Sequence, residues 1–166
     1  MVPILLVTYF TPFGGRKFNV SNPVATQLPN RINEYRVVKK EIPTNMFLVE
    51  KYASKVVNNV RPDAILCLGE FVNTQVEQRA HSKTVPEWRY GDVNGLLDGM
   101  LLYTNSVHST DPGDYACNLI YRTMLDLKTH RTYGNIKKVA FIHLDYKKSP
   151  DELLKGVREG ISKWLT

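Results

Sequence analysis

Three short apolar runs most constrain how this 166-residue chain can fold. The runs cover residues 3–10, 63–69 and 137–144, and they have the length and apolar character of buried strands in a parallel sheet. Strand-like and helix-like segments alternate along the chain, which predicts a three-layer α/β/α sandwich with a mostly parallel central sheet. No repeat, linker or low-complexity segment interrupts the pattern, so we expect one domain over residues 1–166.

The other segments extend the same alternation. We expect further strands over 34–42 and 101–107, an edge strand over 74–81, and a loop with a hairpin over 82–100. We expect helices over 21–28, 45–59 and 114–127, and a last helix that begins at a Ser-Pro-Asp-Glu capping box, residues 149–152. In the second helix, capped by Thr44, the apolar stripe consists of Phe47, Leu48, Tyr52, Val56 and Val60.

Charge and cysteine content exclude several classes of protein. The formal net charge is +6, but the basic residues occur as short pairs with acids between them, so we expect a solvated surface and no nucleic-acid partner. No apolar run is long enough to span a membrane and the N-terminus lacks a signal-peptide pattern, so we expect no membrane partner and a cytoplasmic location. Two cysteines far apart form neither a disulfide framework nor a metal site, and we expect no metal and no cofactor.

Cys117 occupies an unusual position for a cysteine, since it follows the turn Asp-Pro-Gly-Asp-Tyr and precedes a helix-like segment. In the first turn of a helix, unpaired backbone N–H groups and the helix dipole lower the pKa of a thiol and can stabilise an oxyanion. Cys117 is therefore a candidate nucleophile, while Cys67 lies in an apolar run as a packing cysteine would. The alternative is that Cys117 is a small buried hydrophobic residue as well.

His143 and Glu77 are candidate partners of that thiol. His143 follows four apolar residues at the end of a predicted central strand, where it could take the proton of a thiol as a general base. Glu77 lies in the alternating strand and could orient the imidazole as the acid of a triad does. The alternatives are a histidine whose hydrogen bonds go to backbone and a glutamate that faces solvent.

The segment Thr-Pro-Phe-Gly-Gly follows the first predicted strand. Its glycines suit a phosphate loop, but neither of the known glycine-rich phosphate motifs is present. A second hypothesis is a recognition turn in which Phe10 and Phe13 flank an apolar slot and Gly14 and Gly15 let the backbone approach a ligand. Core packing of both phenylalanines is the third.

Taken together, these motifs resemble the pyroglutamyl peptidase I family of cysteine peptidases. The segment VTYFTPFGG is similar to the family's N-terminal motif, and Asn19, Ser21 and Leu28 follow it in register. EIPTNMF and RPDAILCLG are similar to two further family segments. The nucleophile segment is matched by Ser-x-x-x-Gly-x-Tyr-x-Cys-Asn, which ends at Asn118, and the histidine segment by Phe-Ile-His.

The resemblance implies a role for individual residues. Cys117 would be the nucleophile, His143 the general base and Glu77 the orienting acid. The residues that would contact the substrate are Phe10, Phe13, Gly14, Asn19 and Glu70.

Several features depart from the family pattern. The stretch from Gly69 to Glu77 lacks the family's Gly-Arg pair, although Arg79 would share the face of Glu77 by strand alternation. Glu70 replaces an uncharged residue, and the segment between Glu77 and Cys117 is shorter than in the family.

We therefore expect a cofactor-free cysteine peptidase that removes N-terminal pyroglutamate through a Cys-His-Glu triad and a thioester. Its partner would be a small peptide with a blocked N-terminus, and the resemblance also allows a homo-oligomer. One alternative is a relative that hydrolyses another small amide. The other is a non-catalytic relative that binds a small ligand.

Overall fold

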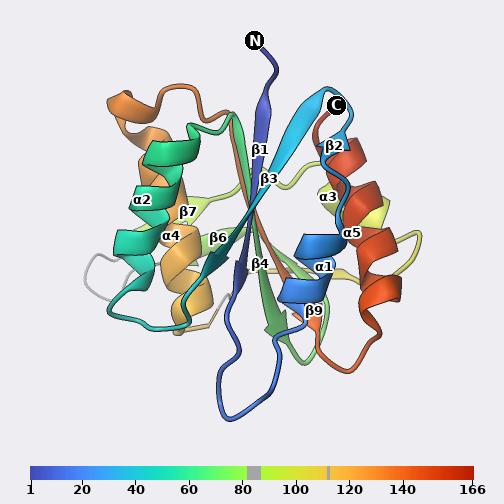
Figure 1. Cartoon of the computed structure of the whole chain (residues 1–166). Coiled ribbons are helices and arrows are strands. Elements are labelled where there is room, and N and C mark those ends of the chain that lie inside the picture. The colour runs from blue at the N-terminus through green and yellow to red at the C-terminus, as the bar shows by residue number, and fades with distance from the viewer. Residues whose placement is uncertain (82–86, 112) are drawn as a thin grey trace.

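The computed structural model describes residues 1–81, 87–111 and 113–166. Its central feature is a seven-stranded sheet in the order β2-β3-β1-β4-β9-β5-β8 (Figure 1). Its strands are β1 (Ile4–Phe10), β2 (Arg31–Ile32), β3 (Tyr35–Ile42), β4 (Ala64–Phe71), β5 (Gln75–Glu77), β8 (Val107–Ser109) and β9 (Lys138–Asp145). The neighbouring strands β3, β1, β4 and β9 are parallel, whereas β2 and β5 run antiparallel to β3 and β9. The predicted mostly parallel sheet is confirmed.

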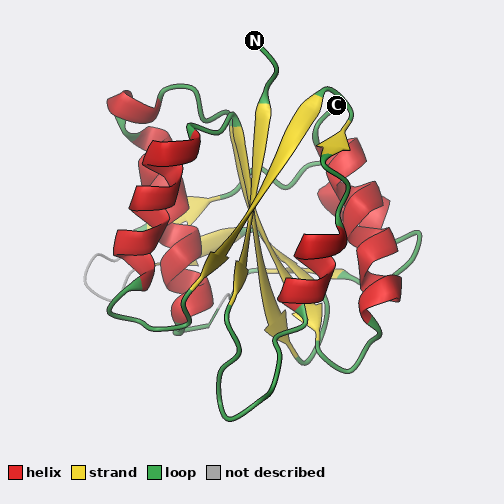
Figure 2. Ribbon diagram, in the orientation of Figure 1, coloured by secondary structure: helices red, strands yellow, loops and turns green. Residues whose placement is uncertain are grey.

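Helices cover both faces of this sheet, as Figure 2 shows. One face carries α2 (Val49–Val60) and α4 (Ala116–Thr129), and the other carries α1 (Ser21–Gln27), α3 (Leu96–Met100) and α5 (Pro150–Trp164). A separate two-stranded sheet pairs β6 (Arg79–His81) with β7 (Trp88–Tyr90), and a 3₁₀ turn (Arg131–Tyr133) precedes β9. The predicted three-layer α/β/α fold class is therefore confirmed.

Side chains that alternate in direction along the central strands form two separate hydrophobic cores, one on each face of the sheet. On β4, Ile65 and Cys67 face α2 and α4, whereas Leu66 and Leu68 face α1 and α5. Side chains on successive strand residues point to opposite faces, and a central strand buried on both faces is apolar throughout. Burial on both faces explains why the three predicted strands are continuous apolar runs, and β1, β4 and β9 confirm these three predictions.

The helix predicted over 45–59 begins later than expected and buries a different stripe. Helix α2 starts at Val49, and its buried residues are Val49, Ala53 and Val57. Phe47 is 94% exposed. Thr44 does not cap the helix, because Leu48 is the N-cap residue, and the backbone N–H of Thr44 instead donates to the hydroxyl of Thr11 in the loop after β1.

Three strand predictions also need correction. The predicted edge strand 74–81 is two strands, and β5 lies inside the sheet between β9 and β8. The predicted strand 101–107 is mostly turn, and only Val107 belongs to a strand. His143 does not end its strand, because β9 continues to Asp145. The hairpin predicted over 82–100 lies partly outside the described residues, and 96–100 is helix α3.

No helix in the described ranges has both the length and the apolar character needed to cross a membrane. No group of three or more His, Cys, Asp or Glu side chains in those ranges is arranged to hold a metal ion.

Helices α3 and α5 meet backbone to backbone. A Cβ added at Gly99 in α3 would lie 2.5 Å from the carbonyl oxygen of Glu159 and 2.6 Å from the Cα of Gly160 in α5. These atoms belong to the main chain of a helix, so they cannot move aside as a flexible side chain would. The close approach therefore requires glycine at this position.

Replacing Gly99 with alanine should force the two helices apart. We expect Gly99→Ala to lower the free energy of unfolding by about 1–3 kcal/mol, as overpacked cores do. Chemical denaturation measures this change, with Lys155→Ala on the exposed face of α5 as the control, expected within about 0.5 kcal/mol of wild type. Equal stability of Gly99→Ala and Lys155→Ala would contradict the tight contact.

Candidate active site

The candidate site lies beyond the carboxyl ends of the parallel strands, where open α/β sheets usually bind ligands. Figure 1 shows the connection between β1 and α1 extending past these strand ends. The same edge of the sheet receives the ends of β4 and β9 and the first turn of α4, whose second residue is Cys117. The topology thus brings three predicted segments together.

The buried pair of Glu77 and His143 is the strongest polar contact of the site. The Glu77 Oε1 atom lies 2.6 Å from His143 Nδ1, the Glu77 side chain is fully buried, and that of His143 is 6% exposed. The rings of Phe141 and Phe71 lie 4.8 and 5.2 Å from the imidazole, centroid to centroid. Because Nδ1 contacts the carboxylate, Nε2 is the imidazole nitrogen left to exchange a proton with another group.

Strand register places Cys117 next to this pair. Gly69 on β4 is the direct partner of His143 on β9, so both residues point toward the α4 face together with Cys67 and Phe141. A Cβ added at Gly69 would lie 2.8 Å from Cys117 Sγ. The thiol therefore rests against Gly69, one strand away from the imidazole, and only glycine leaves room for it.

Helix α4 is anchored to the strand segment that carries Glu77. The Asn118 side chain accepts from the backbone N–H of His81 and donates to its carbonyl, at 3.0 and 2.7 Å. One turn further along, the Tyr121 hydroxyl donates to the backbone carbonyl of Glu77 at 2.8 Å. These contacts fix the position of the first turn of α4, and hence of Cys117, relative to the Glu77–His143 pair.

The protonation of Cys117 differs from the sequence-based expectation. The pKa of its thiol is raised to about 12, mainly by burial and to a smaller extent by the negative charges of neighbouring groups, including Glu77 and Glu70. The hydrogen bond from the backbone in the first turn of α4 acts in the opposite direction but is the smaller effect. The expectation of a lowered pKa was therefore wrong in its net direction, because a thiolate loses more from desolvation here than it gains from the helix terminus.

A cavity of about 350 Å³ opens beside Cys117. Four of the predicted substrate-contacting residues line it, namely Phe10, Phe13, Asn19 and Glu70. The sequence did not single out the other lining residues, which are Thr44, Met46, Tyr115 and Ala116. Tyr115 and Ala116 directly precede the candidate nucleophile, and this adjacency is the one feature of the sequence that could have indicated that they line the cavity.

Asn19 mainly organises the loop between β1 and α1. Its Oδ1 accepts from both the backbone N–H and the hydroxyl of Ser21, and the Ser21 Oγ in turn accepts from the backbone N–H of Phe10. The chain thus ties the end of β1, the loop and the start of α1 together. Gly14 lies in the same loop with a positive φ of 62°, but it is not among the cavity-lining residues.

Glu70 forms the polar wall of the cavity. Its Oε2 accepts from the backbone N–H of Val20 at 3.0 Å, and its Oε1 lies 2.8 Å from Nη1 of Arg16. Sequence reasoning did not identify Arg16. Arg79, which was expected on the face of Glu77, instead stacks on Trp88, because the strand is interrupted at Gln78 between β5 and β6.

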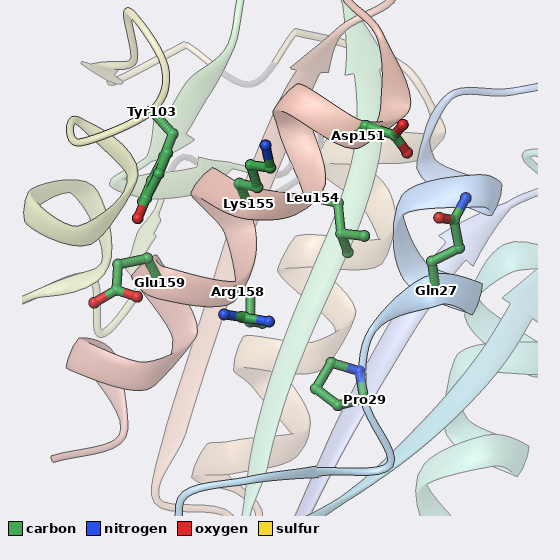
Figure 3. Close-up of a pocket in the computed structure, with 8 residues that line it drawn as sticks. All are labelled: Gln27, Pro29, Tyr103, Asp151, Leu154, Lys155, Arg158 and Glu159. Carbon is green, nitrogen blue, oxygen red and sulfur yellow. The ribbon is translucent and has the colours of Figure 1, made fainter.

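A larger cavity of about 680 Å³ lies on the opposite side of the sheet, against α1 and α5 (Figure 3). Its lining residues are Gln27, Pro29, Tyr103, Asp151, Leu154, Lys155, Arg158 and Glu159. None of the predicted catalytic or substrate-contacting residues is among them. The cavity beside Cys117 is therefore the better candidate for a reactive site.

Comparison with known proteins gives the same family at several levels. The family model described as pyroglutamyl peptidase matches residues 4–81. The pyrrolidone-carboxylate peptidase of Lactobacillus acidophilus is 22% identical over 184 aligned residues, which cover 95% of this chain and 90% of the relative. Pyrrolidone-carboxylate peptidase 2 of Caldanaerobacter subterraneus subsp. tengcongensis is 38% identical, over 40% of this chain and 32% of its own length. Matches of higher identity thus reach only about a third of the relative's length.

Solved structures show the same fold. A variant of pyrrolidone carboxyl peptidase from Pyrococcus furiosus superposes with a TM-score of 0.86 at 18% identity, and the match covers 98% of both chains. Pyroglutamyl peptidase I from Bacillus amyloliquefaciens superposes with a TM-score of 0.85 at 18% identity, over 100% of this chain and 97% of that one. The family model and the curated relatives point to the pyroglutamyl peptidase I family, which confirms the resemblance found in the sequence, and the solved structures show that the chain has the same fold as members of that family.

Proposed function

We propose that this protein is a cysteine peptidase that removes pyroglutamate from the N-terminus of small peptides. The observation that carries the proposal is the buried contact between Glu77 and His143, which lies one strand away from Cys117 and its cavity. This combination supplies a nucleophile, a base and an orienting acid from three separate elements. The names of the relatives add the substrate class.

In the first half of the reaction, Cys117 Sγ attacks the amide carbonyl that follows the lactam ring, while the S–H proton passes to His143 Nε2. The C–N bond then breaks, and the leaving amine takes that proton from the imidazole. The product is a thioester between Cys117 and the pyroglutamyl group. In the second half, water adds to the thioester carbonyl and gives a proton to His143, and the C–S bond breaks so that Cys117 leaves as a thiolate and recovers that proton as pyroglutamate is released.

The cavity provides the groups that such a substrate needs. Phe10 and Phe13 offer apolar surface for the five-membered ring, and Asn19 fixes the loop that carries Phe13. When it is ionised, the Glu70 carboxylate accepts hydrogen bonds but cannot donate them, so it suits the N–H of a lactam. The backbone N–H of Cys117, in the first turn of α4, would help to bind the oxyanion.

Two observations favour alternative functions. Glu70 brings a charged side chain into the cavity, which favours a different small amide as substrate. The raised pKa of Cys117 leaves the thiol protonated at neutral pH, which would suit a relative that binds a small ligand without reacting with it. The following three experiments distinguish these functions.

Replacing Cys117 should abolish turnover. We expect wild type to release the fluorophore from pyroglutamyl-coumarin amide, and Cys117→Ala to be at least about 10³-fold slower in kcat/KM. Cys67→Ala is the matched control, because Cys67 is the other cysteine and lies fully buried in the core on the same face of the sheet. Activity that survives in Cys117→Ala, or that is absent from wild type, would contradict the proposed function.

Alkylation of Cys117 should depend steeply on pH. With a pKa of about 12, roughly one thiol in 10⁵ is ionised at pH 7, so the thiolate fraction should rise about tenfold per pH unit through the alkaline range. Mass spectrometry of the iodoacetamide-treated protein measures the rate for the Cys117 peptide, with a short cysteine peptide as reference. A rate that is fast and flat near neutral pH would show a preformed thiolate–imidazolium pair and contradict this expectation.

Replacing Glu77 with glutamine should impair the chemical step and leave binding intact. A glutamine N–H directed at Nδ1 would favour the tautomer that carries its proton on Nε2, which cannot accept the thiol proton. We expect kcat to fall on the order of 10²–10⁴-fold with KM within about threefold. Circular dichroism tests folding, and Glu87→Gln on the exposed surface is the control. A kcat within twofold of wild type in folded Glu77→Gln would exclude the orienting role.

A further inference from the structure

Arg16 occupies a position that the triad and the family motifs leave unexplained. Its guanidinium Nη1 lies 2.8 Å from Glu70 Oε1, and its central carbon lies 4.5 Å from the centre of the Tyr146 ring and 5.2 Å from that of Phe13. The Arg16 side chain is 40% exposed, so it approaches the cavity wall from the solvent side. It thus connects the β1–α1 loop to the ends of β4 and β9.

The contact changes the charge that the cavity presents. The Glu70 side chain is 2% exposed and its residue lines the cavity together with Cys117. The backbone N–H of Val20 binds one carboxylate oxygen, and Arg16 supplies the only ion pair to the other within the described residues. A buried carboxylate without a counter-charge would attract cations into the cavity, whereas the Arg16–Glu70 pair is neutral overall.

This neutral wall bears on a specific choice between ligands. Pyroglutamate and an N-terminal proline both carry a five-membered ring, but the lactam of pyroglutamate is uncharged, whereas the proline nitrogen is a protonated secondary amine. An apolar slot formed by Phe10 and Phe13 alone would not distinguish two rings of similar size strongly. The charge of the wall at Glu70 is therefore the feature that can discriminate between them.

We propose that Arg16 is a positioning residue that neutralises Glu70 and thereby makes the cavity selective for an uncharged five-membered lactam over a cationic five-membered ring. The substrate class rests on the proposed function, whereas the selectivity itself is a property of the cavity. Arg16 acts through Glu70 and contacts neither the thiol nor the imidazole pair. Its removal should therefore change ligand preference more than it changes the chemical step.

Protection of Cys117 from alkylation tests the selectivity without any turnover. The probes are 2-pyrrolidone, a neutral lactam, and pyrrolidinium, a cation of similar size, added to the whole protein at about pH 8, where secondary ammonium ions stay protonated. The fraction of Cys117 alkylated by iodoacetamide is measured by mass spectrometry at increasing probe concentration. In wild type we expect 2-pyrrolidone to protect Cys117 at concentrations at which pyrrolidinium does not.

Variants then assign the selectivity to Arg16. We expect Arg16→Ala to reduce the preference for the lactam about tenfold, Arg16→Lys to retain most of it, and Arg16→Ala combined with Glu70→Gln to behave like Glu70→Gln alone. Lys17→Ala is the matched control, because Lys17 is an exposed cation on the same loop for which the described residues provide no ion pair. It should keep the wild-type preference.

The outcomes separate this inference from the proposed function. An unchanged preference in Arg16→Ala, an equal loss in Lys17→Ala, or no protection of wild type by 2-pyrrolidone would overturn the inference. The hydrolysis assay is run in parallel on pyroglutamyl- and prolyl-coumarin amides, where Arg16→Ala should shift the ratio of their KM values more than that of their kcat values. Selective protection in a wild type that hydrolyses neither amide would support the inference and refute the proposed function.

Discussion

The contact between Glu77 and His143 is the interaction on which the arrangement of the site depends. A carboxylate without any exposed surface is expensive to bury, and the imidazole Nδ1 at 2.6 Å is its contact on one oxygen. The pair forms because the short strand β5 inserts antiparallel next to β9, so that Glu77 stands opposite Phe141 and next to His143 on the same face. The antiparallel insertion of β5 next to β9 thus both extends the sheet and places Glu77 beside His143.

Helix α4 transfers this local order to the thiol. Asn118 and Tyr121 bind the backbone on either side of Gln78, where β5 ends and β6 begins, so the helix cannot shift without also moving Glu77. Gly69 sets the distance between Cys117 Sγ and β4, because any larger residue at this position would push Sγ away from that strand. Asn118, Tyr121 and Gly69 therefore determine how close Cys117 and His143 can come.

Local sequence patterns predicted the central strands and the candidate residues, but not the parts that long-range contacts decide. The runs that became β1, β4 and β9 are apolar on both faces, and no other environment suits them. Around α2, the stripe through Leu48 and Tyr52 and the stripe through Val49 and Ala53 both have helical spacing, and only packing against the sheet selects the second. Arg16 has no local signature at all, since its partner Glu70 lies 54 residues further along the chain.

The charges of the site explain why its thiol and its cavity must be considered together. Glu77 and Glu70 both oppose ionisation of Cys117, so in the proposed mechanism the acid that orients His143 also keeps the thiol protonated until the imidazole accepts its proton. The two carboxylates have different counter-charges, since Glu77 faces an imidazole whose charge would change in the proposed reaction, while Glu70 faces a permanent guanidinium. In the proposed mechanism, Glu77 therefore balances a charge that changes as the proton moves, whereas Glu70 and Arg16 together keep the charge of the cavity wall constant.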